Sequence, residues 1–514
     1  MRNAFTRFIS RLLRCAAPVS PTSGSIWTRL RPDHGYVKSL VALGYALATL
    51  AVQAAPQLVT PQLPPGIKGQ AYAATLFIGS TLPLTSADAT GLPAGITATH
   101  NGSGTLAFSG TPTVSGTFPL NITATDNAAG TLNTSVSLNV IQVASTATTA
   151  SVVSAGSAHT CAVINGGVQC WGANSNGQLG NNSTTRSLVP VQVTGLTSGV
   201  TAVSAGRSQT CAVVKGGVQC WGDNLDGQLG NNSTTNSPVP VQVTGLTSGV
   251  TAVSAGNFHT CVVVNGGVQC WGNNGSGQLG NNSTTQSLVP VQVTGLTSGV
   301  TAISAGGVHS CAVVNGGVKC WGANFSGQLG NNSTTRSLVP VQVTGLPSGV
   351  TAVSTGVFHT CAGVNGGVLC WGSNDYGQLG NNSTTQSLVP VQVTGLTSGV
   401  TAVSAGGSQT CAVVSGGLQC WGSNDNGQLG SNSTATGLVP VQAIAAGSNV
   451  TAVSAGFAHS CSTVSAAAIC WGSNRRGQLA DAYTAPTLIA GPAFTFTPAV
   501  NVFTLVPIYM LLLE

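Results

Sequence analysis

Two cysteines nine positions apart recur at a fixed interval and are the clearest candidates for chemistry in this chain. The first pair lies in the segment HTCAVINGGVQCWG, which begins at His159. Two such thiols can form a disulfide, bind a metal ion together with the histidine, or exchange electrons with a substrate. The seven pairs are Cys161 and Cys170, Cys211 and Cys220, Cys261 and Cys270, Cys311 and Cys320, Cys361 and Cys370, Cys411 and Cys420, and Cys461 and Cys470. The elements that position the thiols distinguish these uses.

The residues between the cysteines predict a tight hairpin. Asn165 and Gly166 form the strongest short-range signal for a two-residue hairpin loop, because both residues tolerate a positive φ. Pairing outward from this loop places Cys161 opposite Cys170 at a non-hydrogen-bonded pair, where Cα atoms approach to about 4.5 Å. That separation suits a disulfide, which would contribute roughly 2.5 to 3 kcal/mol in the chain-entropy model. We therefore expect a structural disulfide in every repeat.

Zinc binding and redox chemistry fit the pattern less well. The position of His159 is occupied by Gln209 and Gln409 in two other repeats, although both cysteines remain. A glutamine amide is a poor zinc ligand, and the usual short Cys-x2-4-Cys spacing is missing. Hydrogen bonding at a strand start suits histidine and glutamine equally. A redox pair would usually show Cys-x-x-Cys or a thiol of low pKa. We expect no metal site and no cofactor.

The cysteines belong to repeats of fifty residues, and this period predicts a β-propeller. A tryptophan follows each second cysteine from Trp171 to Trp471, and we expect it to pack between blades. Pro240 in the last segment of the second unit removes a ladder donor, so that segment should be an edge strand. A solenoid is the alternative, but neither end of the array has the polar capping repeat that a solenoid needs. The four expected strands of the second unit are residues 200–205, 209–214, 217–221 and 239–244.

The motifs SAGxxHTCAV, GGVQCWGxNxxGQLG and VPVQV are similar to those of the regulator of chromosome condensation family. The resemblance covers residues 151–493 and implies an all-β fold with a seven-bladed propeller. The seventh unit, SAAAICWGSNRRGQLADAYTAPTLIAG, lacks the turn glycines and the GNNSTT loop. The resemblance implies that this unit closes the ring and is completed by a strand from the other end of the array.

Residues 56–145 predict a separate β-sandwich, because short alternating segments are divided by Gly, Pro and Asn clusters. The motifs GLPAG, SGTPT and SGTFPLNITATD resemble immunoglobulin-like domains found in tandem on bacterial surface proteins. Some relatives bind calcium, but Asp88 and Asp126 are the only carboxylates in this region and a calcium site needs more. We expect Asp126 to form a turn with Asn127.

The first 54 residues predict a secretory signal. A basic stretch at 2–38 precedes the apolar run at 40–52, and Ala54 stands where a signal peptidase would cut. Thirteen apolar residues are too few to span a bilayer comfortably; a buried strand or helix is the alternative. Export would carry the protein into an oxidising compartment and remove Cys15, which leaves fourteen cysteines for the seven pairs.

Charge argues against binding to nucleic acid. The formal net charge is +6, but the basic residues concentrate in the leader, and from residue 150 onward seven basic residues face six acidic ones. Nucleic acid binding needs clustered cations. The apolar tail at 494–514 reads as a last strand or as the start of a truncated surface-sorting segment, and is too short for a membrane span.

The positions that differ between repeats are the candidates for a binding face. They lie in two places, the pair after SAG or STG and the loop after CWG. Aromatic and charged side chains on loops of a rigid scaffold suit ligand recognition, and neutral drift in exposed loops is the alternative. The candidates are Arg207, Asp223, Leu225, Asp226, Phe258, Phe325, Phe358, Asp375, Tyr376, Asp425, Arg475 and Arg476.

Together these features predict an exported bacterial protein, secreted or on the cell surface, that binds a protein or glycan as a monomer. No unique nucleophile with a partner base emerges, so we expect no enzyme. One alternative is a secreted inhibitor, because the repeats also resemble those of secreted propellers that cap β-lactamases. Another, from the namesake of the family, is nucleotide exchange on a small nuclear GTPase, which export and near-neutral charge oppose.

Overall fold

The computed structural model consists of β-strands and their connections throughout its described residues. These are residues 55–141, without 60–62, 64, 65, 70, 103 and 129, together with residues 150–480 and Thr487. They contain no helix, and hence no helix long and apolar enough to cross a membrane. The expected signal at 1–54, Cys15 and the tail at 494–514 lie outside the described residues.

The first part of the chain forms two four-stranded sheets, ordered β1-β3-β6-β5 and β2-β8-β7-β4. Apolar side chains of both sheets form one core, in which Leu76, Phe108 and Leu120 are fully buried. The strands are β1 (Gln57–Leu58), β2 (Gly66–Ile67), β3 (Tyr72–Gly79), β4 (Leu84–Thr90), β5 (Ile96–His100), β6 (Thr105–Gly110), β7 (Gly116–Asp126) and β8 (Thr131–Ile141). The alternation of buried and exposed residues along β7 is the pattern of a strand with one face on a core.

The turn predicted at Asp126 is confirmed. The buried Asp126 carboxylate accepts hydrogen bonds from the backbone N–H groups of Ala128 at 2.9 Å and Gly130 at 2.8 Å. Both bonds are local, as expected for an aspartate that satisfies the backbone of its own turn. The side chain therefore serves the connection between β7 and β8.

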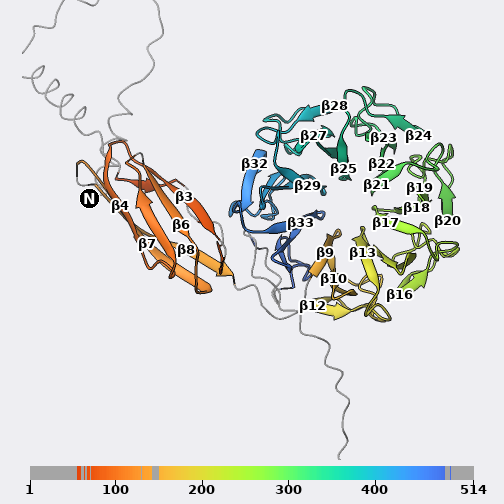
Figure 1. Cartoon of the computed structure of the whole chain (residues 1–514), viewed down its shortest axis with the longest axis horizontal. Helices are drawn as coiled ribbons and strands as arrows, with labels where there is room; N and C mark the ends of the chain where they lie inside the picture. The colour runs from red at the N-terminus through yellow and green to blue at the C-terminus, as the bar shows by residue number, and fades with distance from the viewer. Residues whose placement is uncertain are drawn as a thin grey trace, which may run out of the picture. The chain divides into compact units, whose positions relative to one another are not determined.

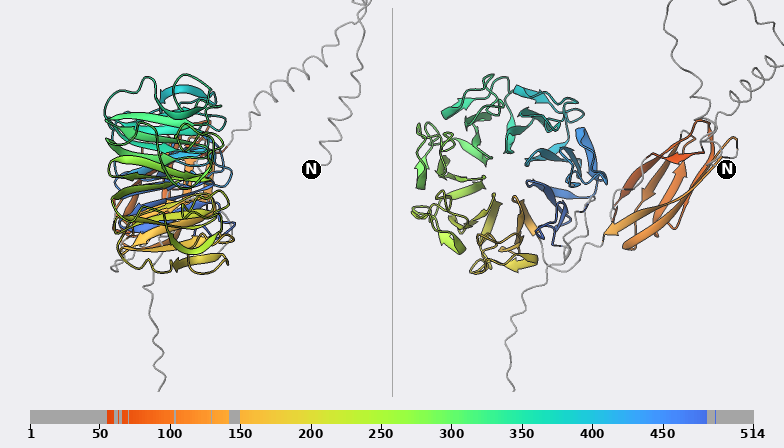
Figure 2. Two further views of the ribbon diagram at one scale, coloured as in Figure 1. Left: turned by 90° about the vertical axis from the view of Figure 1, so that its right-hand side faces the viewer. Right: turned by 180° about the vertical axis from the view of Figure 1, so that it is seen from behind.

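From Ala150 onward the chain forms propeller blades, one after another in sequence order. The first blade has the order β12-β11-β10-β9, five further four-stranded blades repeat it, and a three-stranded sheet, β33-β34-β35, follows. Figure 1 shows the first strand of each blade near the centre and the fourth strands at the periphery, and the colours of the view from behind in Figure 2 show the blades following one another around the ring in chain order. The blades are named first to seventh in this order.

The strands are equivalent from blade to blade. The innermost strands are β9 (Ala150–Ala155), β13 (Val200–Ala205), β17 (Val250–Ala255), β21 (Val300–Ala305), β25 (Val350–Thr355), β29 (Val400–Ala405) and β33 (Val450–Ala455). The second strands are β10 (His159–Ile164), β14 (Gln209–Val214), β18 (His259–Val264), β22 (His309–Val314), β26 (His359–Val364), β30 (Gln409–Val414) and β34 (His459–Val464). The third strands are β11 (Gly167–Gly172), β15 (Gly217–Gly222), β19 (Gly267–Gly272), β23 (Gly317–Gly322), β27 (Gly367–Gly372), β31 (Gly417–Gly422) and β35 (Ala467–Gly472). The outer strands are β12 (Ser187–Gln192), β16 (Ser237–Gln242), β20 (Ser287–Gln292), β24 (Ser337–Gln342), β28 (Ser387–Gln392) and β32 (Gly437–Ile444).

The sequence explains the geometry within a blade. Asn165 and Gly166 adopt φ values of 51° and 76°, and the pairing of β10 with β11 places Cys161 opposite Cys170, so the predicted register is confirmed. In the seventh blade the same turn is made by Ser465 and Ala466. The outer strand β16, which contains Pro240, pairs only with β15, as expected for a strand whose proline cannot donate.

Side chains tie each blade to the next. The hydroxyl of Ser154 accepts a hydrogen bond from the backbone N–H of Ala205 at 2.9 Å, and the same bond recurs between later blades. Between the seventh and first blades, Ala155 donates to Ser454 at 2.9 Å. The seventh blade therefore contacts the first in the way that neighbours along the chain contact each other.

The expected completion of the seventh blade by a strand from the other end of the array is wrong in the described part of the chain. Gly472 pairs instead with Thr487, and the two residues exchange backbone hydrogen bonds of 2.7 and 2.9 Å. Gly422 pairs with Gly437 in the sixth blade at the same sequence spacing. The chain thus begins the fourth position of this blade with its own downstream residues.

Candidate functional site

The cysteine pairs are structural, because each is bonded within its own blade. The structure contains all seven expected disulfides, with Cα atoms of each pair 4.0 to 4.1 Å apart. All fourteen cysteines are buried. Sulfur atoms bonded to each other are not thiolate ligands, so the disulfides stiffen the middle of each blade and leave any recognition to other residues.

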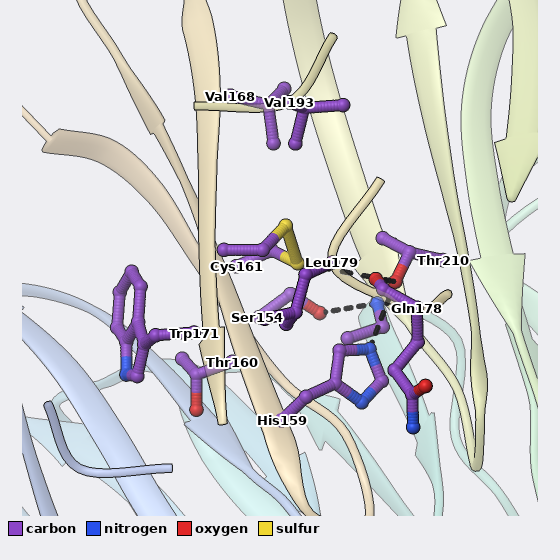
Figure 3. Close-up of a disulfide and its surroundings, with 12 residues drawn as sticks. Ser154, His159, Thr160, Cys161, Val168, Trp171, Gln178, Leu179, Val193 and Thr210 are labelled. Carbon is purple, nitrogen blue, oxygen red and sulfur yellow. Dashed lines mark hydrogen bonds between the residues drawn. A yellow bond between two sulfur atoms is a disulfide. The ribbon is translucent and has the colours of Figure 1, made fainter. Parts of the chain in front are cut away.

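The tryptophans pack between blades, as predicted. Trp221 of the second blade is fully buried and shares a core with Cys161, Cys170 and Val168 of the first. Its indole N–H donates to the backbone carbonyl of Gln178 at 2.9 Å. Figure 3 shows the Cys161 disulfide with Val168, Val193 and Leu179 around it. Each disulfide is thus shielded by the next blade.

The histidines at the start of the second strands also bond between blades. His159 Nε2 lies 2.9 Å from Thr210 Oγ1, and that hydroxyl donates its own proton to the backbone carbonyl of Gln178 at 3.0 Å (Figure 3). The hydroxyl can therefore only accept from the imidazole, which places the ring proton on Nε2. At Gln209 the amide donates instead to the carbonyl of Gly256 at 2.8 Å. Both side chains thus donate across the blade interface, as the His-to-Gln exchange predicted.

Burial keeps these imidazoles neutral. Desolvation lowers the pKa of His159, His259 and His359 to about 4. For His309 and His459, burial acts together with neighbouring histidines and lowers the pKa to about 3. The buried Nδ1 atoms have no hydrogen-bond partner, so protonation would leave a charge unpaired in the core. These residues serve the fold at neutral pH.

The two variable places found in the sequence lie at the same end of the propeller. The loop after the first strand and the loop after the third strand project from the same end of an antiparallel blade. They are also bonded directly, because the backbone N–H of Asp223 donates to the carbonyl of Ser208 at 2.9 Å, and Asn273 does the same to Phe258. We call this end the recognition end.

Four of the predicted site residues form two pairs across neighbouring blades. Phe325 and Phe358 meet edge to face, with ring centroids 5.1 Å apart. Both are exposed, as is Tyr376 on the next loop, and we call these three residues the aromatic region. The guanidinium of Arg207 lies over the Phe258 ring, 4.8 Å from its centroid. The structure thus gathers aromatic candidates that are separate in sequence.

The remaining candidates lie on the same end but have other contacts. Asp226 accepts from Asn273 at 2.8 Å and Asp223 from Gln228 at 3.0 Å, so these carboxylates hold loops in place. Asp375 accepts from Ser373 at 3.2 Å. The exposed residues of this group are Leu225, Asp375, Asp425, Arg475 and Arg476.

One pocket on the recognition end includes residues that the sequence analysis missed. It has a volume of about 390 Å³ and is lined from the first, second and seventh blades. Arg207 and Arg476 were candidates, whereas Arg186 and Gln178 were not. Arg186 could have been found, because its position varies between repeats; its counterparts are Asn236, Gln286, Arg336, Gln386 and Thr436. We call this site the arginine pocket.

With this geometry, the repeats define a family. Residues 125–462, more than half of the chain, match the model of the RCC1-like domain, and the chain belongs to this family. Residues 47–141 match the model described as Putative Ig domain. Both matches agree with the resemblances seen in the sequence.

Solved structures share the fold. The crystal structure of human WBSCR16 is 23% identical and matches with a TM-score of 0.57, covering 64% of this chain and 93% of that chain. The ectodomain of the receptor kinase CR4 from Physcomitrella patens is 18% identical, with a TM-score of 0.39, and the match covers 63% of this chain and 73% of that chain. No curated protein matches the chain significantly. At these identities the likeness to WBSCR16 concerns the fold alone.

Proposed function

We propose that the chain is an exported bacterial binding protein, in which a closed seven-bladed propeller follows an immunoglobulin-like sandwich and recognises a protein at its recognition end. The single observation that carries this proposal is the aromatic region on a scaffold whose other parts repeat almost unchanged. Phe325 is 59% exposed, Tyr376 47% and Phe358 38%. Exposed aromatic residues that lie together are typical of the centres of protein interfaces.

The disulfides support export. Disulfides form and persist outside the cytosol, whether the protein is released or kept at the cell surface. They also suit a binding role, because a stiff scaffold loses little conformational entropy when its loops meet a partner. The proposed role is non-enzymatic, and the protein acts as a monomer.

The other repeats supply matched variants for a test. In the triple variant Phe325→Ser, Phe358→Ser and Tyr376→Asn, each new residue already stands at the equivalent position of another repeat, as Ser175, Ser208 and Asn176 do. Such changes leave the framework intact. A control variant, Lys215→Asn with Ser415→Asn, alters hairpin turns at the opposite end of the propeller and introduces the residue present at Asn165 and Asn265.

The experiment is chemical cross-linking of the purified, oxidised protein to proteins of its own culture medium and cell envelope, followed by mass spectrometry. We expect the wild type and the control variant to cross-link one and the same protein. The yield of this cross-linked product should be at least about tenfold lower for the aromatic variant. Equal cross-linking by all three proteins, or none by any, would overturn the proposal.

A further inference from the structure

A second region of the recognition end, the arginine pocket, has the features of a small-ligand site. Its volume of about 390 Å³ lies in the range of about 300 to 1,000 Å³ that is usual for such sites. Its walls come from loops of three blades, so the ring brings Arg186 and Arg476 together from opposite ends of the repeat array. The chemistry of its wall indicates the ligand.

The pocket contains an amide donor that has no partner in the described part of the protein. Gln178 is only 3% exposed, and its Oε1 accepts from the backbone N–H of Asn176 at 2.9 Å. In five other blades the amide nitrogen of the equivalent glutamine donates to the side chain five residues earlier, as Gln228 does to Asp223 and Gln378 to Ser373. In the first blade that position is Ala173.

The amide nitrogen of Gln178 therefore has no hydrogen-bond partner within the described chain, and Gln178 lines the pocket. Figure 3 shows its side chain extending away from the disulfide, past the ring of His159. Because Gln178 lines the pocket and its amide nitrogen is bonded to no other described group of the protein, this N–H group can donate to an acceptor bound there.

The arginines make the pocket cationic. Arg186, Arg207 and Arg476 all line it, and its described lining includes no aspartate or glutamate. The position of Arg186 reaches toward the preceding blade, because its counterpart Arg336 donates to the carbonyl of Gly275 at 3.3 Å. For Arg186 the preceding blade is the seventh, which supplies Arg476. Neighbouring like charges repel each other, and a bound anion would relieve that repulsion.

Arg207 belongs to the part of the lining that the second blade supplies. Its guanidinium lies 4.8 Å from the centroid of the Phe258 ring. A guanidinium stacked on a ring keeps its N–H groups free at the edge, where they can donate to a carboxylate in a bidentate arrangement. The stacking also restricts the side chain before a ligand arrives. The wall thus combines at least one amide and three guanidinium donors.

The rest of the lining favours a sugar over an acidic peptide. Ser157, Ser175, Thr184 and Ser208 place hydroxyl groups in the wall. Hydroxyl groups both donate and accept, as the hydroxyls of a sugar ring do. A single glutamate side chain would pair with the arginines but leave much of this polar wall without partners, which weakens binding.

We infer that the arginine pocket binds a uronate unit of an acidic polysaccharide, with the carboxylate on the arginines and Gln178 and the sugar hydroxyls on the serine and threonine side chains. The inference rests on the proposed function only in that the pocket belongs to the recognition end. It adds a carbohydrate ligand to a protein partner that the aromatic region would bind.

The test is calorimetric titration of the oxidised, full-length exported protein with tetragalacturonate and with tetraglucuronate. The matched probes are the methyl esters of the same tetramers, which keep the sugars and remove the charge, and a tetraglutamate peptide. We expect at least one uronate tetramer to bind, and its methyl ester and the peptide to bind at least about tenfold more weakly.

Substitutions taken from other repeats locate the site. Arg186→Gln and Arg476→Asn, which match Gln286 and Asn426, should each weaken binding by roughly tenfold. Ala173→Ser should weaken it by about fivefold, because the new hydroxyl would accept from Gln178 as Ser373 accepts from Gln378. The control Arg336→Gln lies in the fourth blade and should leave the affinity unchanged.

The results separate this inference from the proposed function. Failure of both uronates to bind, tighter binding of the peptide, or equal affinities of the Arg186 and Arg336 variants would each overturn the pocket assignment. None of these results would change the cross-linking by the aromatic region. Conversely, a chain that binds a uronate through Arg186 but cross-links no protein would overturn the proposed protein partner alone.

Discussion

The arginine pocket and the aromatic region occupy equivalent places in the repeat, between the first and second blades and between the fourth and fifth. Ser175 and Ser208 line the pocket, and their counterparts are Phe325 and Phe358, which pack on each other. Both places also share an alanine, a glutamine and an arginine, since Ala323, Gln328 and Arg336 correspond to Ala173, Gln178 and Arg186. The two serines thus leave a polar surface in the first place, whereas the two phenylalanines give an apolar surface in the second.

The buried glutamines show the consequence. Gln178 lines a pocket, whereas Gln328 is 0% exposed and its amide nitrogen is buried without a partner. The neighbours differ too, because Arg207 and Arg476 have the counterparts Val357 and Ser276. A few loop side chains therefore decide whether a place in this framework is a polar pocket or an apolar surface, while the backbone stays the same.

Replacing the two pocket serines by phenylalanine should have the largest effect on the difference between the two places. We expect Ser175→Phe with Ser208→Phe to fill the arginine pocket and to weaken binding of the uronate tetramer by about a hundredfold, because the ligand would lose its cavity and its donors. Calorimetric titration measures the effect. The reverse exchange, Phe325→Ser with Phe358→Ser, should not create a second uronate site, since Val357 and Ser276 stand where the pocket has Arg207 and Arg476. A second site in that variant would contradict the role given to Arg207 and Arg476.

Removing a disulfide from the first blade or from the fourth blade should lower the stability of the protein by the same amount. Replacing Cys161 and Cys170 by alanine should lower the free energy of unfolding by roughly 2.5 to 3 kcal/mol, the entropy of a ten-residue loop. The same change at Cys311 and Cys320 should have the same effect, because both disulfides span nine positions at a Cα separation of 4.1 Å. Urea unfolding followed by tryptophan fluorescence checks this. Unequal losses of unfolding free energy would show that the two blades differ in their strands as well as in their loops.

His159 in the first blade and His309 in the fourth should lower the stability of the protein over different ranges of acid pH. An unfolded histidine titrates near pH 6.5, whereas burial lowers the pKa of His159 to about 4. For His309, burial with His259 and His359 nearby lowers it to about 3. Below pH 6.5 these histidines therefore bind protons in the unfolded chain but stay neutral in the folded chain. Stability falls by up to about 1.4 kcal/mol per pH unit for each such histidine.

Glutamine variants isolate each histidine, because Gln209 shows that the position accepts glutamine. His159→Gln should reduce the loss of stability down to about pH 4, and His309→Gln down to about pH 3. Urea midpoints measured from pH 7 to pH 3 report the difference. If both variants keep the pH slope of the wild type, the histidines are not buried in their neutral form.

The smallest effect concerns the two unpaired glutamines. Ala323→Ser should raise the free energy of unfolding by about 1 kcal/mol, because the new hydroxyl would accept from the buried amide of Gln328, as Ser373 does from Gln378. Ala173→Ser should raise it less, because Gln178 faces a pocket that water can enter. Thermal unfolding of the two variants compares them. An equal gain of stability at both positions would mean that the amide of Gln178 is as inaccessible to water as that of Gln328.

Much of the fold could be predicted because its rules are local. Asn165 and Gly166 define a turn, the turn defines a register, and the register pairs Cys161 with Cys170. The aromatic and charged loop residues could be chosen as candidates because they interrupt an otherwise constant repeat. These inferences depend on residues a few positions apart.

The arginine pocket could not be predicted in this way. Arg186 and Arg476 are at opposite ends of the array and share a pocket only because the seventh blade packs on the first. The missing partner of Gln178 follows from Ala173, whose small side chain carries no chemical signal in the sequence. The expected completion of the seventh blade from the other end of the array was wrong, because it was inferred from the family, whereas Gly472 pairs with the downstream residue Thr487.

The most direct test of the central claim, an oxidised framework that carries a recognition end outside the cytosol, is the intact mass of the natively exported protein before and after reduction. Seven disulfides predict that reduction adds fourteen hydrogens, and that a thiol reagent labels none of the fourteen repeat cysteines when the protein is unfolded in denaturant before reduction. Fourteen thiols labelled without reduction, and no gain of mass on reduction, would contradict the account.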